Sequence, residues 1–273
     1  MITDELWAVI EPLLPPVPER PRGGRPCIPN RDVLRGILFV LATGLPWEYL
    51  PPEMGCGSGM TGRRRLKEWH EAGLWQRLHK LLLDRLGETD RIDWSRASPD
   101  ASAVPAGKGG GQTGANPTHR GKSGTKRHVV VDGQGIPLAV TVSAANAHDS
   151  RMMLETVAAI EPVKGRRGRP RKRPRKLHAD KAYDAQPLRK ELRQRGIAPR
   201  MARRGIESSE RLGRHRWVVE HTLCGLNRYR RLRIRYERRA DMHLALLQLG
   251  CALICWNFVN HEVLLGALSL KHL

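Results

Sequence analysis

Apolar residues recur at helical spacing in the first third of the chain. This periodicity predicts four short helices, which end at Pro15-Pro16, Gly44, Gly73 and just before Gly87. The expected ranges are 4–14, 31–43 (with Asn30 as N-cap), 61–72 and 74–86. The third helix is strongly basic. Short helices joined by tight turns fit a helix-turn-helix-like DNA-binding unit. They fit equally well a helical bundle with one solvated cationic face.

After residue 87 the helical periodicity gives way to short apolar runs. Residues 128–131 and 136–143 flank the sequence Asp132-Gly133-Gln134-Gly135, which predicts a β-hairpin. Residues 105–127 are rich in glycine, lysine and serine and are expected to form a mobile loop. The other expected elements are strands at 177–179 and 197–201, helices at 150–160 and 187–195, a helix around Glu220 and an apolar helix from Asp241. Strands interleaved with helices predict a mixed α/β layer, and therefore a helical domain over residues 1–88 followed by an α/β domain over residues 89–273.

The chain of 273 residues has a formal net charge of +21, and 40% of its residues are hydrophobic. A folded chain with this charge implies a polyanionic partner. Nucleic acid is favoured over a membrane, because the chain shows no span of about 20 apolar residues. The longest apolar stretch, Leu244–Phe258, contains polar residues and predicts a core helix. The acidic N-terminus does not resemble a signal peptide, and five cysteines without Cys-x-x-Cys spacing favour a reducing cytoplasm and argue against a zinc site.

Residues Lys164–Lys176 form the most basic stretch, with nine Lys or Arg and no acid. Because these charges repel one another, the stretch is expected not to fold on itself. Its Arg-Gly-Arg-Pro sequence resembles segments that lie in the narrow minor groove of A·T tracts. The simpler alternative, which we favour, is a solvated loop with non-specific affinity for phosphates.

Glu220 is the only acid in an arginine-rich helix. It follows Trp217, Val218 and Val219 directly, which indicates partly buried surroundings. A buried carboxylate is costly unless it is paired or binds a metal. Helix geometry alone favours a salt bridge from Glu220 to a neighbouring arginine, Arg214 or Arg216.

Two further isolated acids change this picture. Asp180 ends a predicted strand, where open α/β sheets place their sites, and Asp100 lies in the sequence Ser-Pro-Asp-Ala-Ser. Together with Glu220 they could converge on hard divalent ions, which take oxygen ligands. Two such ions about 3.5–4 Å apart activate a water or 3′-hydroxyl and stabilise the leaving oxygen of a phosphodiester. Four other acids compete for this role, although Asp149 and Asp184 fit helix caps better and Asp132 fits the hairpin turn; the fourth is Asp93.

Short motifs follow one another along nearly the whole chain. They are LPWEYLP (45–51), WHEAGLW (69–75), Asp100, GTKRH (124–128), GIPLA (135–139), ADKAYD (179–184), RWVVE (216–220) and LNRYRRL (226–232). In their order and spacing they resemble a bacterial insertion-sequence transposase with an Asp-Asp-Glu site, of the insertion-sequence-5 family.

This resemblance implies an RNase H-like mixed sheet flanked by helices, and an enzyme that cuts and rejoins double-stranded DNA at inverted-repeat ends. It implies that Asp100, Asp180 and Glu220 bind Mg²⁺ or Mn²⁺, as two ions, and that Arg216 clamps a phosphate or orients the glutamate. Joining two DNA ends favours a homodimer or higher oligomer. The residues expected to contact DNA are Arg63, Arg64, Arg65, Lys67, Lys126, Arg127, Arg166, Arg167, Arg169, Arg171, Asn227, Arg228 and Arg231.

The sequence departs from the family pattern at three positions. Pro99 precedes Asp100, and proline is unwelcome in a central strand. Gly213 stands where related chains often have tyrosine, and His221 where they often have arginine. These departures leave a second hypothesis open, a decayed copy that only binds DNA, and a third, a protein that packages nucleic acid without sequence preference.

Overall fold

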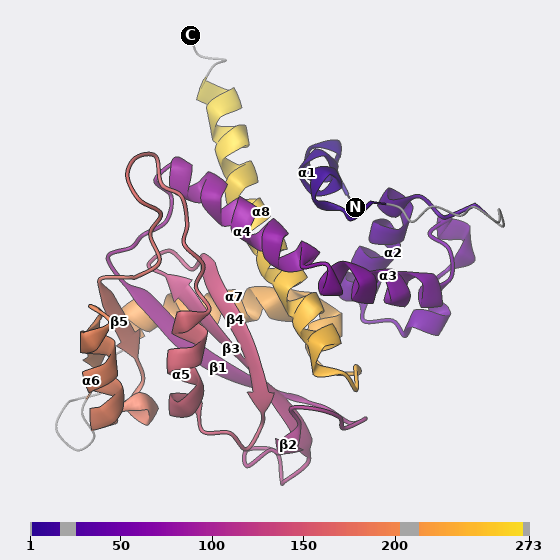
Figure 1. The fold of residues 1–273 in the computed structure, drawn as a ribbon. Helices are drawn as coiled ribbons and strands as arrows, with labels where there is room; N and C mark the ends of the chain where they lie inside the picture. The colour runs from indigo at the N-terminus through magenta and orange to yellow at the C-terminus, as the bar shows by residue number, and fades with distance from the viewer. Residues whose placement is uncertain (1, 17–25, 203–212, 270–273) are drawn as a thin grey trace.

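The computed structural model describes residues 2–16, 26–202 and 213–269, and Figure 1 shows their arrangement. The predicted helices of the first third of the chain are confirmed: α1 (Asp4–Ile10), α2 (Asn30–Thr43), α3 (Gly59–Glu71) and α4 (Leu74–Glu88), with short 3₁₀ helices at Glu11–Leu13, Trp47–Tyr49 and Pro52–Met54. Gly44 ends α2 in the left-handed conformation, as its sequence position predicts. The capping role expected of Asn30 is wrong, because Pro29 holds the N-cap position and Asn30 is the first helical residue.

A six-stranded mixed sheet follows these helices. Its strands are β1 (Ala97–Pro105), β2 (Gly114–Ala115), β3 (Ser123–Asp132), β4 (Pro137–Ala144), β5 (Lys176–Ala179) and β6 (Ala198–Met201). The order is β2-β3-β1-β5-β6, and β4 pairs with β3. The predicted hairpin is confirmed as β3 and β4, which are antiparallel. The mobile loop expected at 105–127 is wrong at both ends, because Pro105 belongs to β1 and residues 123–127 extend β3.

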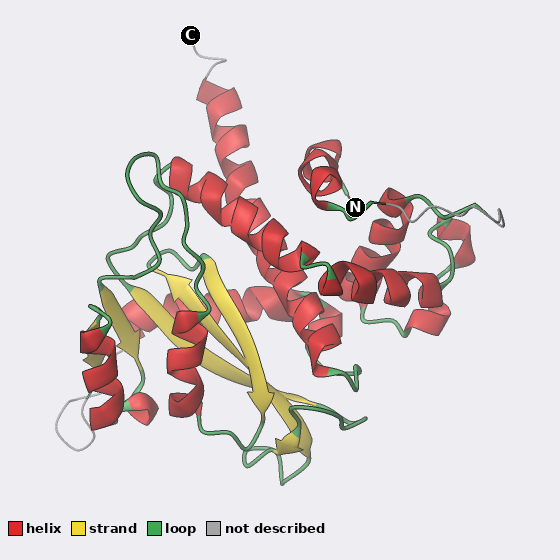
Figure 2. Cartoon of the chain, in the orientation of Figure 1, coloured by secondary structure: helices red, strands yellow, loops and turns green. Residues whose placement is uncertain are grey.

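Helices cover both faces of the sheet. They are α5 (Asp149–Ala158), α6 (Gln186–Gln194), α7 (Gly213–Arg228) and α8 (Ala240–Ser269), with 3₁₀ turns at Lys181–Tyr183 and Arg230–Leu232. Consecutive side chains of β3 point to opposite faces of the sheet. The contacts of two such side chains show which helix covers each face. Lys126 forms an ion pair with Asp149 of α5, at 2.9 Å. Arg127 donates to Asn227 of α7, at 2.6 Å. The sheet therefore lies between α5 and α7 (Figure 2).

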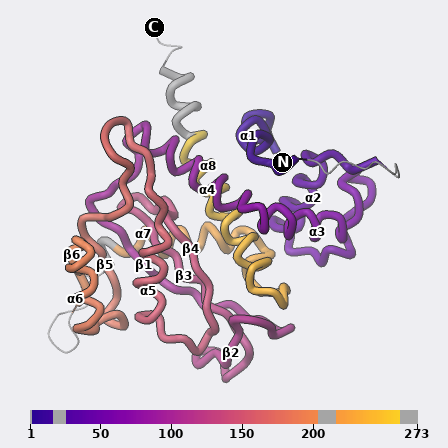
Figure 3. The backbone as a smooth tube through the Cα atoms, viewed as in Figure 1, coloured from indigo at the N-terminus to yellow at the C-terminus, as the bar shows by residue number. Residues whose placement is uncertain are grey.

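The N-terminal helices and the sheet share one hydrophobic core. Leu34 of α2, Trp75 of α4, Val130 of β3 and Leu246 of α8 are all fully buried members of it. In Figure 3, α4 and α8 lie side by side above the sheet. Residues Ala240–Asn260 of α8 are long and apolar enough to cross a membrane, which was not expected from the sequence, but 61% of the tested stretch is buried inside the protein. Their contacts are those of a core helix.

A buried ion pair also connects the two parts of the chain. Arg231 and Glu237 are 4% and 7% exposed, and their side chains are 2.7 Å apart. The Arg231 guanidinium additionally donates to the Leu45 carbonyl, just beyond α2, at 3.1 Å. It also stacks on the rings of Trp47 and Tyr236. This arginine therefore joins the N-terminal helices to the segment between α7 and α8.

Candidate active site

Asp100 lies in β1, and Asp180 directly follows the neighbouring strand β5. β1 and β5 are parallel and pair at Ala97 and Leu177. Each aspartate is three residues beyond its paired residue, so the two acids follow the pairing point at equal spacing along the chain. Pro99 does not interrupt β1, although this strand is central. β1 remains paired with β3 along its whole length, whereas its pairing with β5 is at Ala97, before the proline is reached.

The carboxylate of Asp100 is on the face of the sheet that α7 covers. Side chains two residues apart on a strand share a face, so Asp100 and Ser102 point the same way. Ser102 contacts the guanidinium of Arg127, which in turn binds Asn227 of α7. The alternation along β1 thus directs Asp100 towards α7, the helix that carries Arg216 and Glu220.

Arg216 lies between the two aspartates. Its guanidinium nitrogens are 3.7 Å from an Asp100 oxygen and 3.8 Å from an Asp180 oxygen. The Arg216 side chain is only 15% exposed, so solvent screens this contact weakly. From the sequence, Glu220 was expected either to form a salt bridge with Arg214 or Arg216 or to bind a metal. Among the described side chains, Arg216 instead forms ion pairs with both aspartates. The side chain of Arg214, the other candidate partner, lies outside the described side chains.

Glu220 is one helical turn after Arg216, and its side chain is exposed. The prediction that its neighbours in the sequence are buried is confirmed for Val218 and Val219. It is wrong for Trp217, which is 58% exposed. Glu220 is close enough to act on Asp100. Burial raises the pKa of Asp100, and the charges of Glu220 and Asp180 raise it further, against the lowering effect of Arg216. The three acids therefore share one electrostatic environment.

The carboxylates fit a divalent cation in charge and in donor type. Asp100 and Asp180 already share a cationic partner in Arg216, and carboxylate oxygens are the ligands that hard ions prefer. In the part of the chain that the structure describes, no three His, Cys, Asp or Glu side chains stand in a complete metal-binding arrangement. Arg216 lies between the two aspartates, and Glu220 is exposed.

The acids that competed for this role have other partners. Asp132 accepts hydrogen bonds from the backbone N–H groups of Gln134, Ile136 and Asp93 and so stabilises the hairpin turn, as expected. Asp93 accepts from Ser95.

The helix caps expected of Asp149 and Asp184 are wrong. His148 caps α5, and Asp149 pairs with Lys126. Asp184 pairs with Arg189, at 2.7 Å.

Tyr183 is a site residue that the sequence reasoning missed. It lies in the 3₁₀ turn directly after Asp180 and is 3% exposed. Burial is the main cause that raises the pKa of its phenol, and the negative charges of Asp149, Asp100 and Asp180 add to it. The phenol therefore stays protonated beside the carboxylates. The signal was present in the ADKAYD motif, where Tyr183 follows Asp180 by three residues.

The cations expected to contact DNA divide into exposed and internal groups. The guanidinium of Arg127 is fully buried, and burial lowers its pKa to about 10. Arg231 is buried in its ion pair with Glu237, and Asn227 accepts from Arg127. Arg127 and Arg231 are therefore side chains of the protein interior, whereas Asn227 is half-buried and its expected contact with DNA stays a prediction. Sequence periodicity could not reveal this, because β3 was expected to begin only at residue 128.

The other expected cations lie in four places. Lys126 is half-buried and paired with Asp149. On α3, Arg64 and Arg65 are within 3.6 Å of Glu68, and Lys67 is 3.5 Å from Glu71, which reduces the positive charge of that face. The remaining expected cations are exposed in the described structure and have no acid three or four residues away; they lie at the start of α3, in the basic loop and at the end of α7: Arg63, Arg166, Arg167, Arg169, Arg171 and Arg228.

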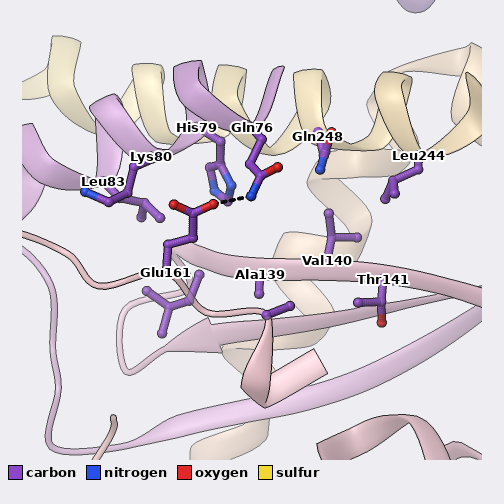
Figure 4. A pocket seen from close by; sticks show the side chains of 12 residues that line it. Gln76, His79, Lys80, Leu83, Ala139, Val140, Thr141, Glu161, Leu244 and Gln248 are labelled. Atoms are coloured by element: carbon purple, nitrogen blue, oxygen red, sulfur yellow. Dashed lines mark hydrogen bonds between the residues drawn. The ribbon is translucent and has the colours of Figure 1, made fainter. Parts of the chain in front are cut away.

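A cavity of about 210 Å³ lies elsewhere, between α4, α8 and β4. Figure 4 shows His79 and Gln248 facing it from the helices and Thr141 from the strand. Gln76 donates to Glu161 at its entrance. None of the three carboxylates lines this cavity, so it is separate from the site.

Comparison with known protein families gives two matches in succession. Residues 2–79 match the family described as "Putative transposase of IS4/5 family", and residues 97–258 match the family described as "Transposase DDE domain". The second match alone spans more than half of the chain. It includes Asp100, Asp180, Arg216 and Glu220. A DDE domain also implies dependence on a divalent metal.

Two relatives come from Burkholderia cepacia. The "Putative transposase for insertion sequence element IS402" is 51% identical over 146 residues, which are 54% of this chain and 69% of the relative. The "Insertion element IS402 uncharacterized 16.2 kDa protein" is 55% identical over 119 residues, 43% of this chain and 81% of the relative.

Solved structures are much less similar. The Mos1 strand transfer complex gives a TM-score of 0.28 at 11% identity, with 87% of this chain and 81% of that chain covered. The Mos1 mariner paired end complex with Mn gives 0.25 at 12% identity, with 87% and 82% covered. The sequence matches carry the assignment instead, and they show that the chain belongs to the IS4/5 family of DDE transposases.

Proposed function

We propose that this transposase binds the terminal inverted repeats of an insertion sequence and catalyses metal-dependent cleavage and strand transfer of DNA. Asp100, Asp180 and Glu220 would hold the metal, as Mg²⁺ or Mn²⁺ and as two ions. The observation that carries this proposal is that Asp100 and Asp180, which follow the pairing point of two parallel strands, both lie within 3.8 Å of Arg216. The antiparallel β3-β1 pair followed by the parallel β5 also supports an RNase H-like sheet.

The residues of the site have separate tasks in this reaction. Asp100 in β1 and Asp180 at the end of β5 provide negative charge. Glu220 and Arg216 lie on one face of α7 and supply one charge of each sign. When bound, the metal would activate a water or 3′-hydroxyl and stabilise the leaving oxygen. Once released from the aspartates, the Arg216 guanidinium can hold a phosphate oxygen through two N–H donors.

The chain's charge supports double-stranded DNA as the partner. A net charge of +21 favours binding to the phosphate backbone of transposon ends and of target DNA. Two ends must be brought together before they are joined, so we propose a homodimer or a higher oligomer on DNA. We propose helix α3 of residues 1–88 as part of the DNA-binding surface and residues 89–273 as the catalytic part, in a cytoplasmic protein.

The proposal is tested by cleavage of a duplex that carries the inverted repeat flanking the gene. Cleavage is expected with Mg²⁺ and not with EDTA. Asp180→Asn and Glu220→Gln should each abolish it, because an amide does not neutralise a divalent ion, while DNA affinity stays nearly unchanged. Asp90→Asn and Glu155→Gln are matched controls, since both acids are exposed and outside the site. Binding without any cutting by the wild-type protein would favour the decayed copy instead.

A further inference from the structure

The basic stretch Lys164–Lys176 is folded back on itself, contrary to the expectation from its charge. Val163 and Arg171 exchange two backbone hydrogen bonds, at 2.8 and 2.7 Å, which close the loop at its base. Gly168 turns the tip with a φ of +86°, a conformation that favours glycine. Pairing of the backbone therefore overcomes the repulsion between side chains, which point outwards into solvent.

The closed loop is also attached to the body of the protein. The Lys164 N–H donates to the Asp84 carboxylate of α4, at 2.8 Å, and Asp84 itself is paired with Lys80. Gly87 provides the necessary room, because a Cβ there would lie 2.1 Å from the Lys164 carbonyl oxygen. On the other side, the Arg175 N–H donates to the Trp94 carbonyl, at 2.9 Å. Both ends of the loop are thus held in place.

The side chains presented by this loop are almost all cationic. Between residues 164 and 176 the sequence has nine Lys or Arg and no acid. The arginines at its tip are exposed: Arg166, Arg167 and Arg169. This differs from α3, where two glutamates lie within 3.6 Å of the basic side chains. The loop is therefore a fixed surface of high positive charge.

The loop is at the opposite end of β5 from the carboxylates. It leads into the first residue of the strand, Lys176, whereas Asp180 follows the last residue, Ala179. Four residues at about 3.3 Å each place the two ends of the strand about 13 Å apart. Figure 1 shows the loop rising beside the C-terminal end of α4. The loop thus lies at the end of β5 that is away from the carboxylates.

We infer that this loop is a second binding site for the DNA backbone, separate from the active site of the same subunit. The inference rests on the proposed function. With about 3.4 Å between phosphates along a strand, the loop contacts the duplex at least about four base pairs from the scissile phosphate, or contacts DNA bound by another subunit. It contributes to affinity and not to the chemical step.

The affinity of the loop is tested with a matched pair of variants. One carries Arg166→Gln, Arg167→Gln and Arg169→Gln. The other carries Lys190→Gln, Arg193→Gln and Arg200→Gln, which are also exposed. Each lowers the net charge by three, from +21 to +18. Arg171 is kept because its backbone closes the loop. The probe is a duplex of about 40 base pairs with the inverted repeat at its centre, measured by fluorescence anisotropy without divalent ions.

In the loop variant the slope of log K against log salt should become shallower by two to three, since each lost phosphate contact removes about 0.9. The control variant should keep the wild-type slope. Equal slopes in the two variants would overturn the inference, because overall charge would then explain the affinity. This measurement needs no cleavage, so it can fail or succeed independently of the proposed function.

The location of the loop is tested by hydroxyl-radical footprinting on the same duplex. The loop variant should lose protection in a patch at least about four base pairs from the cleavage point and retain protection around that point. At saturating DNA its rate of cleavage should equal that of the wild type. Loss of protection at the cleavage point, or a fall in this saturated rate, would place the loop at the active site and contradict the inference.

Discussion

Asp100 and Asp180 each lie three residues beyond the one point where their parallel strands pair. This register brings together two acids that are 80 positions apart in the sequence. It also explains why Arg216 can approach both, at 3.7 and 3.8 Å. The site is thus organised by the sheet first and completed by α7.

Arg216 occupies the position between two proposed metal ligands, so it should compete with the metal. Arg216→Gln removes a partly buried ion pair worth roughly 1 kcal/mol, and the affinity for Mn²⁺ should rise about fivefold, as measured by electron paramagnetic resonance of free Mn²⁺. Cleavage should fall, because the phosphate loses a bidentate donor. Arg228→Gln, an exposed arginine at the end of the same helix, is the control. Unchanged or weaker Mn²⁺ binding by Arg216→Gln would show that the guanidinium does not compete.

Acid should destabilise the protein through its buried histidines. Burial lowers the pKa of His243 to about 3, and the positive charges of Arg235, Arg127 and Arg231 assist. Burial likewise lowers the pKa of His128 to about 4. As the pH falls below about 6.5 the unfolded chain binds protons that the folded chain does not, so the free energy of unfolding decreases.

This dependence can be measured by urea unfolding between pH 4 and pH 6. His243→Gln should make the plot of unfolding free energy against pH flatter by about 1.4 kcal/mol per pH unit, the value for one proton. His221→Gln, an exposed histidine, should leave it unchanged. If His243→Gln has the same slope as the wild type, the pKa of His243 does not differ between the folded and unfolded chain.

The buried pair of Arg231 and Glu237 should show strong coupling. Removing one partner leaves an unpaired buried charge, so Arg231→Met or Glu237→Leu should each cost about 3–5 kcal/mol of unfolding free energy. The double variant should cost much less than the sum. Urea unfolding of the four proteins gives this interaction energy. Additive costs would contradict the account of how the N-terminal helices are joined to the rest.

Gly59 should not tolerate a methyl group, although it is in a helix. A Cβ at this position would lie 1.6 Å from the Trp47 carbonyl oxygen. Gly59→Ala is therefore expected to lower the unfolding free energy by about 1–3 kcal/mol, as overpacking does. Gly107→Ala is the matched control, because nothing lies within 4 Å of its Cβ. Equal melting temperatures for the two variants would show that α3 can move away from Trp47.

The sequence predicted the helices and strands better than the contacts that their side chains and loops make. Helical periodicity identified α2 and α4 closely, since their apolar faces enter the core. It could not show that Arg127 is buried, because β3 continues through polar residues, and Arg127 among them binds Asn227 of α7. Nor could it show that the basic loop closes, since that depends on a backbone bridge between Val163 and Arg171.

The three acids could be selected from the sequence, but their arrangement could not. Only the pairing of β1 with β5 sets Asp100 beside Asp180, and that pairing joins segments far apart in the chain. The position of Arg216 between the aspartates likewise depends on how α7 lies on the sheet. The sequence instead favoured a salt bridge of Glu220 to Arg216 or Arg214, because residues four apart share a helix face.

The most direct test of the central claim is a titration of the protein–DNA complex with Mn²⁺, followed by the resonance signal of the free ion. The wild-type complex should bind Mn²⁺, and Asp100→Asn, Asp180→Asn and Glu220→Gln should each reduce the number of ions bound or weaken their affinity at least tenfold, while Asp90→Asn binds as the wild type does. If all three site variants bind Mn²⁺ as the wild type does, these carboxylates are not the metal ligands.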